Sequence, residues 1–200
     1  MSFWSRRRRG GAEESPTAVG PTTTRLAVVE FWAGSHRTVA GVDLSQDRLT
    51  DLINHGEVLA VVLLDEVPED PSQPIGMTAG QAWTQLSVGE ALLILPPPQV
   101  TDPRRRLHRP RQPVEITIGP FVVSGMAHVP PGAQAAGFLI RQTARFVPVT
   151  RASVRDTGLQ GFEQRAEVVL VNMRRVDKIL DVGLDQPDPL PSTEASAPIA

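Results

Sequence analysis

An order of strand-like segments that occurs twice constrains the fold of this chain more than any other feature. Residues 26–31 and 36–44 are two apolar, β-branched segments separated by a glycine-containing turn. Residues 114–118 and 121–129 are a second such pair, again separated by a turn with glycine. One order of features at two places in a chain indicates a duplicated unit.

Later segments extend the correspondence, because each pair of hairpin strands is followed by a spacer and by further apolar segments of strand length. The matching segments are 59–67 with 145–154, and 90–95 plus Val100 with 167–171 plus Val176. We therefore predict two similar small β units. The alternative is one β domain whose strands look alike because they share the composition of strands.

Glycine lies inside the second strand of each unit, at Gly41 and Gly125. An internal glycine weakens a strand unless a bulge, a tight bend or a close backbone approach requires it. Strongly bent strands close small barrels. The sequence therefore predicts a mainly β protein of two tandem small β-barrel-like units, in which these two glycines occupy equivalent structural positions.

Local signals add short helices and one irregular strand. Apolar spacing predicts a helical turn or two at 48–54 and a short helix in the equivalent place at 133–140. Pro148 lies inside the predicted strand 146–149, and proline cannot donate to a strand ladder, so that strand is expected to be an edge or to carry a bulge.

Shifts in composition divide the chain into five parts. Residues 1–24 and 184–200 lack periodic apolar positions, and we predict a disordered basic leader and a disordered acidic tail. A first β unit covers 25–100 and a second covers 114–183. Between them, residues 101–113 are rich in arginine and proline, and we predict a linker there.

Composition excludes several classes of protein. The chain has 200 residues, a formal net charge of −2, 4% aromatic residues and no cysteine. A disulfide framework and a thiolate site are therefore excluded, and stacking platforms for nucleic acid are scarce. No apolar run approaches the roughly 18 residues of a membrane helix. We expect a cytoplasmic bacterial protein without a transmembrane segment.

Catalytic and metal-binding patterns do not emerge from the sequence. The four histidines are His36, His55, His108 and His128. None is paired at the spacing of metal ligands, and the chain contains neither a nucleophile elbow nor a P-loop. The acidic residues Asp65, Glu66, Glu69 and Asp70 could bind a cation, although a solvated loop fits them better. We predict a protein that is not an enzyme and needs neither cofactor nor metal.

The second unit resembles a distant Sm-like small barrel. Gly125 matches the glycine of that family's bent strand, and residues 172–179 match its closing motif, although Met173 stands where the family prefers glycine. The first unit offers Gly41 and residues 63–67 for the same pattern. Sm-like domains assemble into rings and bind single-stranded RNA through loop residues. The resemblance implies that Asn172, Arg174 and Arg175 are the residues to test.

The linker also invites comparison with PilZ domains. Residues 105–109, Arg-Arg-Leu-His-Arg, are similar to the arginine arm with which that family clamps the phosphates of cyclic di-GMP. The partner motif, Asp or Asn-x-Ser-x-x-Gly on a following strand, is absent, so this interpretation is disfavoured.

The sequence therefore favours a non-enzymatic interaction or assembly module, whose partner is an unknown protein or further copies of the chain. The alternative is nucleic-acid or nucleotide binding, which we expect to be weak, through the linker and the pair Arg174 and Arg175. The linker arginines are Arg104, Arg105, Arg106, Arg109 and Arg111. A third hypothesis, an enzyme, lacks a visible nucleophile and base.

Overall fold

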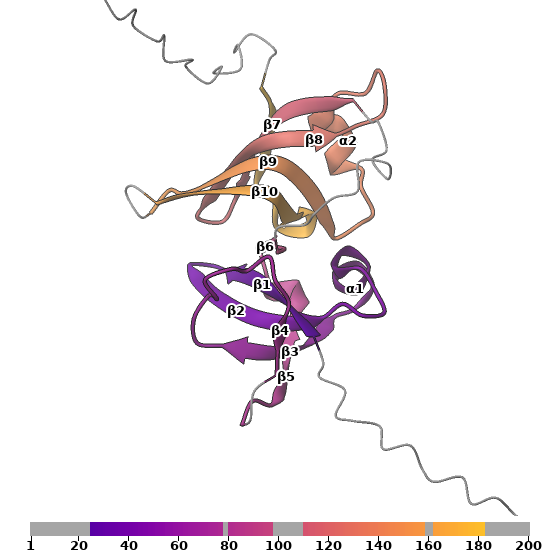
Figure 1. Ribbon diagram of the computed structural model, residues 1–200. Helices are drawn as coiled ribbons and strands as arrows, with labels where there is room; N and C mark the ends of the chain where they lie inside the picture. Colours follow the sequence, from indigo (N-terminus) through magenta and orange to yellow (C-terminus); the bar gives the residue numbers. More distant parts are fainter. Residues whose placement is uncertain (1–24, 78–79, 98–109, 159–161, 183–200) are drawn as a thin grey trace, which may run out of the picture.

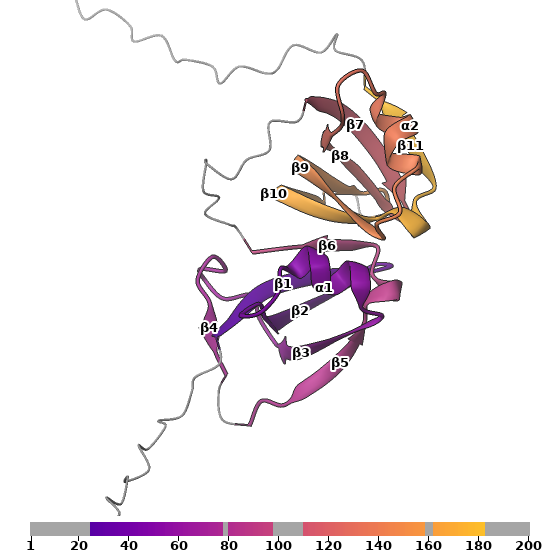
Figure 2. The same cartoon turned by 90° about the vertical axis from the view of Figure 1, so that its right-hand side faces the viewer.

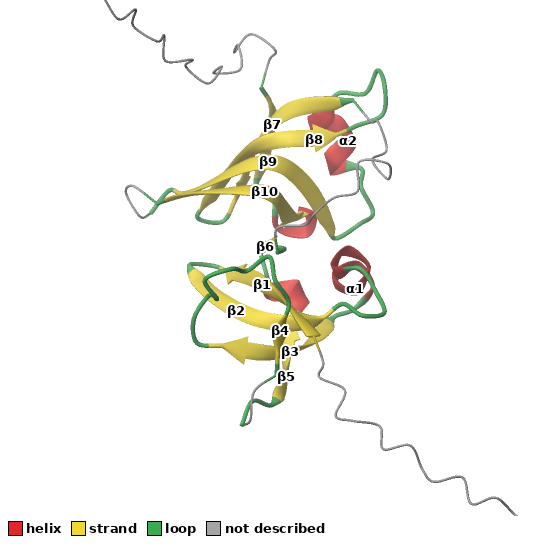
Figure 3. Ribbon diagram, in the orientation of Figure 1, coloured by secondary structure: helices red, strands yellow, loops and turns green. Residues whose placement is uncertain are grey.

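The computed structural model describes residues 25–77, 80–97, 110–158 and 162–182, and its strands form one continuous antiparallel sheet (Figure 1). Strands dominate both halves, and the helices are short (Figure 3). The prediction of a mainly β protein is confirmed. The basic leader, the acidic tail and most of the linker lie outside the described residues.

The N-terminal half comprises residues 25–97. Its elements are β1 (Arg25–Ala33), β2 (His36–Asp43), α1 (Leu49–His55), β3 (Val58–Leu64), β4 (Ile75–Gly76), β5 (Trp83–Ser87), the 3₁₀ helix η1 (Val88–Glu90) and β6 (Leu93–Leu95). The helix predicted at 48–54 is α1. Leu49 and Ile53 are its buried residues, and they lie on one face because they are four positions apart.

The C-terminal half comprises residues 110–182. Its elements are β7 (Arg111–Ile118), β8 (Phe121–His128), α2 (Ala135–Ile140), β9 (Phe146–Asp156), β10 (Glu163–Asn172), the 3₁₀ helix η3 (Met173–Arg175) and β11 (Lys178–Asp181). The predicted second helix is α2. β7 begins three residues earlier than the predicted second unit, so residues 111–113 belong to a strand and not to a linker.

The strands follow the order β11-β7-β8-β9-β10-β6-β1-β2-β3-β5, with the two-residue β4 pairing β1. β6 belongs to the N-terminal half, yet it pairs with both β1 and β10. The two halves therefore share one hydrogen-bonded ladder. Figure 2 shows β6 between β10 and β1. Among the described strands this ladder stays open and does not close into a barrel.

The pairing registers establish that the two halves repeat one topology. Trp32 faces Leu93 on β6 as Thr117 faces Lys178 on β11. Val58 of β3 faces Ser87 of β5, as Phe146 of β9 faces Asn172 of β10. In both halves the first strand pairs with the second and with the last, the second pairs with the third, and the third pairs with the fourth.

One correspondence predicted from the sequence is wrong. Segment 167–171 lies in β10, the fourth strand of its half, and its true counterpart is β5. Segment 90–95 contains β6, the last strand of its half, and its true counterpart is β11. The two segments look alike because both are buried on two faces of the sheet, and they are in fact neighbours in space.

Each half has its own hydrophobic core, and each core also contains side chains from the other half. Leu93 and Leu95 of β6 pack into the core of the C-terminal half together with Trp32. Conversely, Phe146 and Leu170 of the C-terminal half pack into the core of the N-terminal half, where they lie with Ile94. Successive residues of a strand point to opposite faces, so one strand contributes to both cores.

The two internal glycines lie in tight but different surroundings. A Cβ atom on Gly125 would lie 2.6 Å from Val149 Cγ1 and 3.0 Å from the Thr150 carbonyl oxygen. A Cβ atom on Gly41 would lie 2.9 Å from Leu26 Cδ1. Gly125 lies on the same face of β8 as the core residues Val123 and Ala127, whereas Gly41 lies between the core-facing residues Ala40 and Val42 of β2. Gly125 therefore points toward the core of its half, Gly41 points away from the core of its half, and the two glycines are not equivalent.

Gly125 lies opposite an irregularity in β9. The register between β8 and β9 shifts by one residue between the pairs Ser124–Ser153 and Met126–Thr150. Within this interval Arg151 has a φ of 50°, a left-handed backbone conformation. The sequence predicts from Pro148 that this strand is either an edge strand or carries a bulge. β9 lies between β8 and β10, so the bulge is the correct alternative, although it lies three residues beyond the proline.

Candidate functional site

The residues predicted to bind nucleic acid are not all within the described part of the chain. Arg104, Arg105, Arg106 and Arg109 lie outside it. Arg111 is the first residue of β7, is exposed and faces His128 across the ladder. This arginine is therefore held by a strand rather than by an irregular linker.

Arg174 and Arg175 are exposed residues of η3. η3 leads into β11, and the first residue of β11, Lys178, faces Thr117 near the end of β7. Arg111 lies six residues away along that strand, a separation of about 20 Å. The structure therefore does not bring the linker strand end and the η3 arginines together.

Asn172, the third residue implied by the Sm-like resemblance, is buried and makes hydrogen bonds within the protein. Its side chain is only 1% exposed. Its Nδ2 donates to the Ala91 carbonyl oxygen at 2.8 Å, and its Oδ1 accepts from the Arg174 backbone amide at 3.1 Å. Asn172 thus caps η3 and fastens β10 to the N-terminal half, with no free polar edge turned toward solvent.

The acidic segment 65–70 also has a local structural explanation at its last residue. The Asp70 carboxylate accepts hydrogen bonds from the Ser72 hydroxyl and backbone amide and from Gln73. The bonds from Ser72 are the main cause of a lowered pKa for Asp70, which is fully exposed. In the described ranges no three His, Asp or Glu side chains gather as metal ligands would.

Residues from distant parts of the sequence converge where β6 pairs with β10. We call this pairing, together with the side chains beside it, the junction. Leu170 pairs with Ile94, and Val171 pairs with Leu93. Strands buried on both faces are continuous apolar runs and not alternating ones. That signal is present in residues 93–95 and 168–171, but it does not say that the two runs pair.

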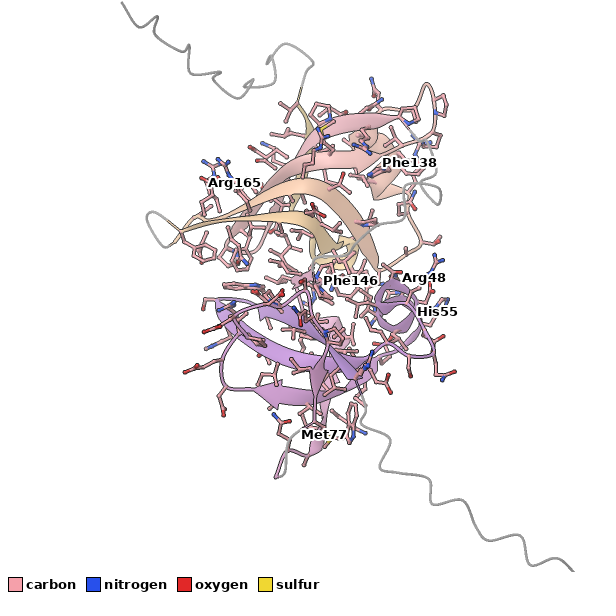
Figure 4. The ribbon with its side chains drawn as sticks, in the orientation of Figure 1. Arg48, His55, Met77, Phe138, Phe146 and Arg165 are labelled. Carbon is pink, nitrogen blue, oxygen red and sulfur yellow. The ribbon has the colours of Figure 1, made fainter. Side chains whose placement is uncertain are left out.

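Polar groups fasten the junction on one side. Arg145 is 5% exposed and donates to the Gly56 carbonyl oxygen at 3.3 Å and to the Glu57 carboxylate, with which it forms an ion pair. The Asn54 side chain accepts from the Phe146 amide at 2.7 Å and donates to the Phe146 carbonyl at 3.2 Å. Phe146 lies where the two halves meet, near α1 (Figure 4).

Aromatic side chains fasten the other side. The Trp32 ring lies 5.5 Å from the Phe121 ring in an edge-to-face arrangement, and 5.5 Å from the ring of Phe162. Arg37 stacks over Trp32 at 5.9 Å and also pairs with Glu30. Trp32 is a first-half residue, so this cluster anchors β1 in the core of the C-terminal half.

The sheet ends in two strands whose outer edges pair with no described strand, β5 and β11. Large apolar side chains are exposed at both ends. Val58 and Leu63 of β3 are each 51% exposed, Trp83 of β5 is 44% exposed and Leu180 of β11 is 42% exposed. These two open edges with their apolar side chains are the candidate interaction site, and the sequence analysis did not single them out.

Compared with known proteins, the chain matches no family model and shows no significant similarity to a curated protein or a solved structure. None of the helices in the described residues is long and apolar enough to cross a membrane.

Proposed function

We propose that the protein is a non-enzymatic interaction or assembly module that binds partner proteins by strand pairing at the edges β5 and β11. The observation that carries this proposal is the junction, where β10 of one half adds to β6 of the other. Strand addition at an open edge supplies main-chain hydrogen bonds, and neighbouring side chains supply specificity.

The exposed apolar residues support the same proposal. An open strand edge is usually protected by charge, proline or a covering segment, because it otherwise templates association. Here β5 contains no charged residue, and its first residue, Trp83, is half-exposed. Aromatic side chains are enriched in protein interfaces, so Trp83 is the residue we expect to anchor a partner.

We further propose that each half is a small barrel-like unit of the Sm-like kind. Each half has five main strands, of which the first pairs with the last, and each surrounds its own core. The bulge opposite Gly125 bends β9, as barrel strands require. Under this proposal the protein is cytoplasmic and bacterial, as the composition suggests.

Nucleic-acid binding remains the second candidate. One observation favours it: Arg174, Arg175 and Lys178 are exposed within one short stretch. Arginine and lysine neutralise phosphates without base-specific geometry, so such binding would be strongly salt-dependent. Against it stand the net charge of −2 and the buried position of Asn172.

One co-purification experiment separates these candidates. Wild-type protein and the double variant Leu63→Arg, Trp83→Arg are purified from cells that express a second, differently tagged copy. Mass spectrometry and immunodetection report bound protein, and the ratio of absorbance at 260 and 280 nm reports bound nucleic acid. Thermal unfolding of both proteins checks that the variant is folded.

We expect the wild type to retain a bound polypeptide that the variant loses, with an absorbance ratio typical of protein alone. Equal retention of every polypeptide by a folded variant would refute the proposed β5 surface. A raised absorbance ratio that Arg174→Ala and Arg175→Ala abolish would favour nucleic-acid binding instead.

A further inference from the structure

We propose that the partner of the two open edges is a second copy of this chain, which pairs its β5 with β11 in the register of the internal junction. This inference rests on the proposed function and names the occupant of its edges. Because the repeat carries the same register through both halves, the junction is a template for this contact.

The strand registers define the intermolecular pairs. Asn172 of β10 corresponds to Ser87 of β5, because they face Phe146 and Val58 at the start of equivalent strands. Lys178 of β11 corresponds to Leu93 of β6, because they face Thr117 and Trp32 in equivalent strands.

The junction pair Leu170–Ile94 therefore maps onto Gln85 of one copy and Ile179 of the next. Likewise Val171–Leu93 maps onto Leu86 and Lys178. Pairing in this register would extend the sheet across two molecules in the same antiparallel sense as the junction.

Burial at the two edges agrees with this mapping. Leu95 corresponds to Leu180, because they face Glu30 and Glu115 in equivalent strands. Leu95 is 5% exposed inside the junction, whereas Leu180 is 42% exposed at the open edge. Leu86, the counterpart of Val171, packs against the core of its own half, as Val171 does. The open edge thus exposes a leucine where the junction covers one.

The open edges also differ from the junction in a way that sets the strength of the contact. Lys178 stands in place of Leu93, Gln85 in place of Leu170, and Ser87 in place of Asn172. A charged residue on an edge strand opposes uncontrolled pairing. We therefore infer a reversible, concentration-dependent contact that is weaker than the junction.

The contact joins two different edges, so it is head-to-tail. Such a contact leaves one edge of each kind free after the first step, and it generates either a closed ring or an open filament. Copies added in this way would alternate between internal junctions and intermolecular contacts along one sheet.

Engineered disulfides test the register, because the natural chain has no cysteine to interfere. The variant Gln85→Cys, Ile179→Cys places its two thiols at opposite ends of the sheet, so a disulfide between them has to join two molecules. A disulfide requires Cβ atoms about 3.5–4.5 Å apart, which directly opposed residues of neighbouring strands approach. The variant Leu86→Cys, Lys178→Cys tests the adjacent pair, and Gln85→Cys, Asp181→Cys is the out-of-register control.

After mild oxidation we expect ladders of cross-linked multimers from at least one in-register pair and a several-fold lower yield from the control. Light scattering of the wild type should show a mass that rises with concentration, and Leu180→Lys should reduce that rise. A wild type that stays monomeric at every concentration, with equal cross-linking in and out of register, would overturn the inference. If Leu63→Arg, Trp83→Arg still loses a different protein partner, the proposed function stands and only the second copy is excluded.

Discussion

Replacing Asn172 by alanine tests whether this residue fastens the junction or binds RNA. The change removes the 2.8 Å bond to the Ala91 carbonyl, which is buried, and the 3.1 Å bond from the Arg174 amide, which is partly buried. Leaving the buried Ala91 carbonyl oxygen without a donor costs about 1–3 kcal/mol. Losing the second hydrogen bond costs only about 1 kcal/mol, because water can replace it. We therefore expect a loss of about 2–4 kcal/mol in the free energy of unfolding.

The matched control is Ser87→Ala. Ser87 occupies the corresponding position before η1, but it is exposed and its side chain makes no capping bond. Surface changes of this kind usually alter stability by no more than about 0.5 kcal/mol. A shift of a few kcal/mol in a domain of this size lowers the Tm by on the order of 10 °C, so the two variants should separate clearly.

Denaturant unfolding followed by circular dichroism measures the free energies, and fluorescence anisotropy with a labelled oligonucleotide measures RNA binding on the folded proteins. We expect Asn172→Ala to lower stability and leave any oligonucleotide binding unchanged. If Asn172→Ala and Ser87→Ala were equally stable, the reasoning about the junction would be refuted. A selective loss of RNA binding at full stability would restore the role implied by the Sm-like resemblance.

Three further outcomes are expected. In denaturant unfolding, Gly125→Val should lower the free energy of unfolding by up to about 3 kcal/mol and Gly41→Val by about 1 kcal/mol. The reason is that a Cβ atom on Gly125 would meet backbone atoms of β9, whereas one on Gly41 would meet a leucine side chain. Equal losses for the two variants would contradict this account. Removing residues 1–24 and 184–200 should leave the Tm within a few degrees, and loss of cooperative unfolding would show that the unit boundaries are misplaced. We expect the wild type to bind an oligonucleotide only weakly, above the micromolar range, and alanine at Arg104, Arg105, Arg106, Arg109 and Arg111 should weaken this binding further. Submicromolar binding that survives 200 mM salt would refute the interaction module.

Local patterns in the sequence were sufficient to place most of the strands and both helices. Alternating and β-branched segments predict strands because side chains on a strand point to alternate faces. The hairpin turns at Gly34 and Gly119 have positive φ values of 57° and 52°, a conformation that glycine adopts readily. These signals lie within a few residues of one another, so no tertiary information is needed to interpret them.

The candidate site was less accessible to sequence reasoning. Asn172, Arg174 and Arg175 were grouped because they are adjacent in the chain, yet the structure buries the first and exposes the other two. Arg145 and Asn54 gave no signal, because their partners lie about ninety residues away in the other half. The open edges were equally hidden, since an edge is defined by what fails to pair with it.

By itself, the sequence determined that the chain is mainly β and that one order of strands occurs twice. Only the tertiary structure decided which strands correspond and which strands meet. The apolar runs in β6 and β10 look like copies because burial on both faces selects the same residues at both places. They are instead partners across the junction, since strand pairing depends on contacts between segments far apart in the chain, and the composition of a strand records its burial but not its neighbour.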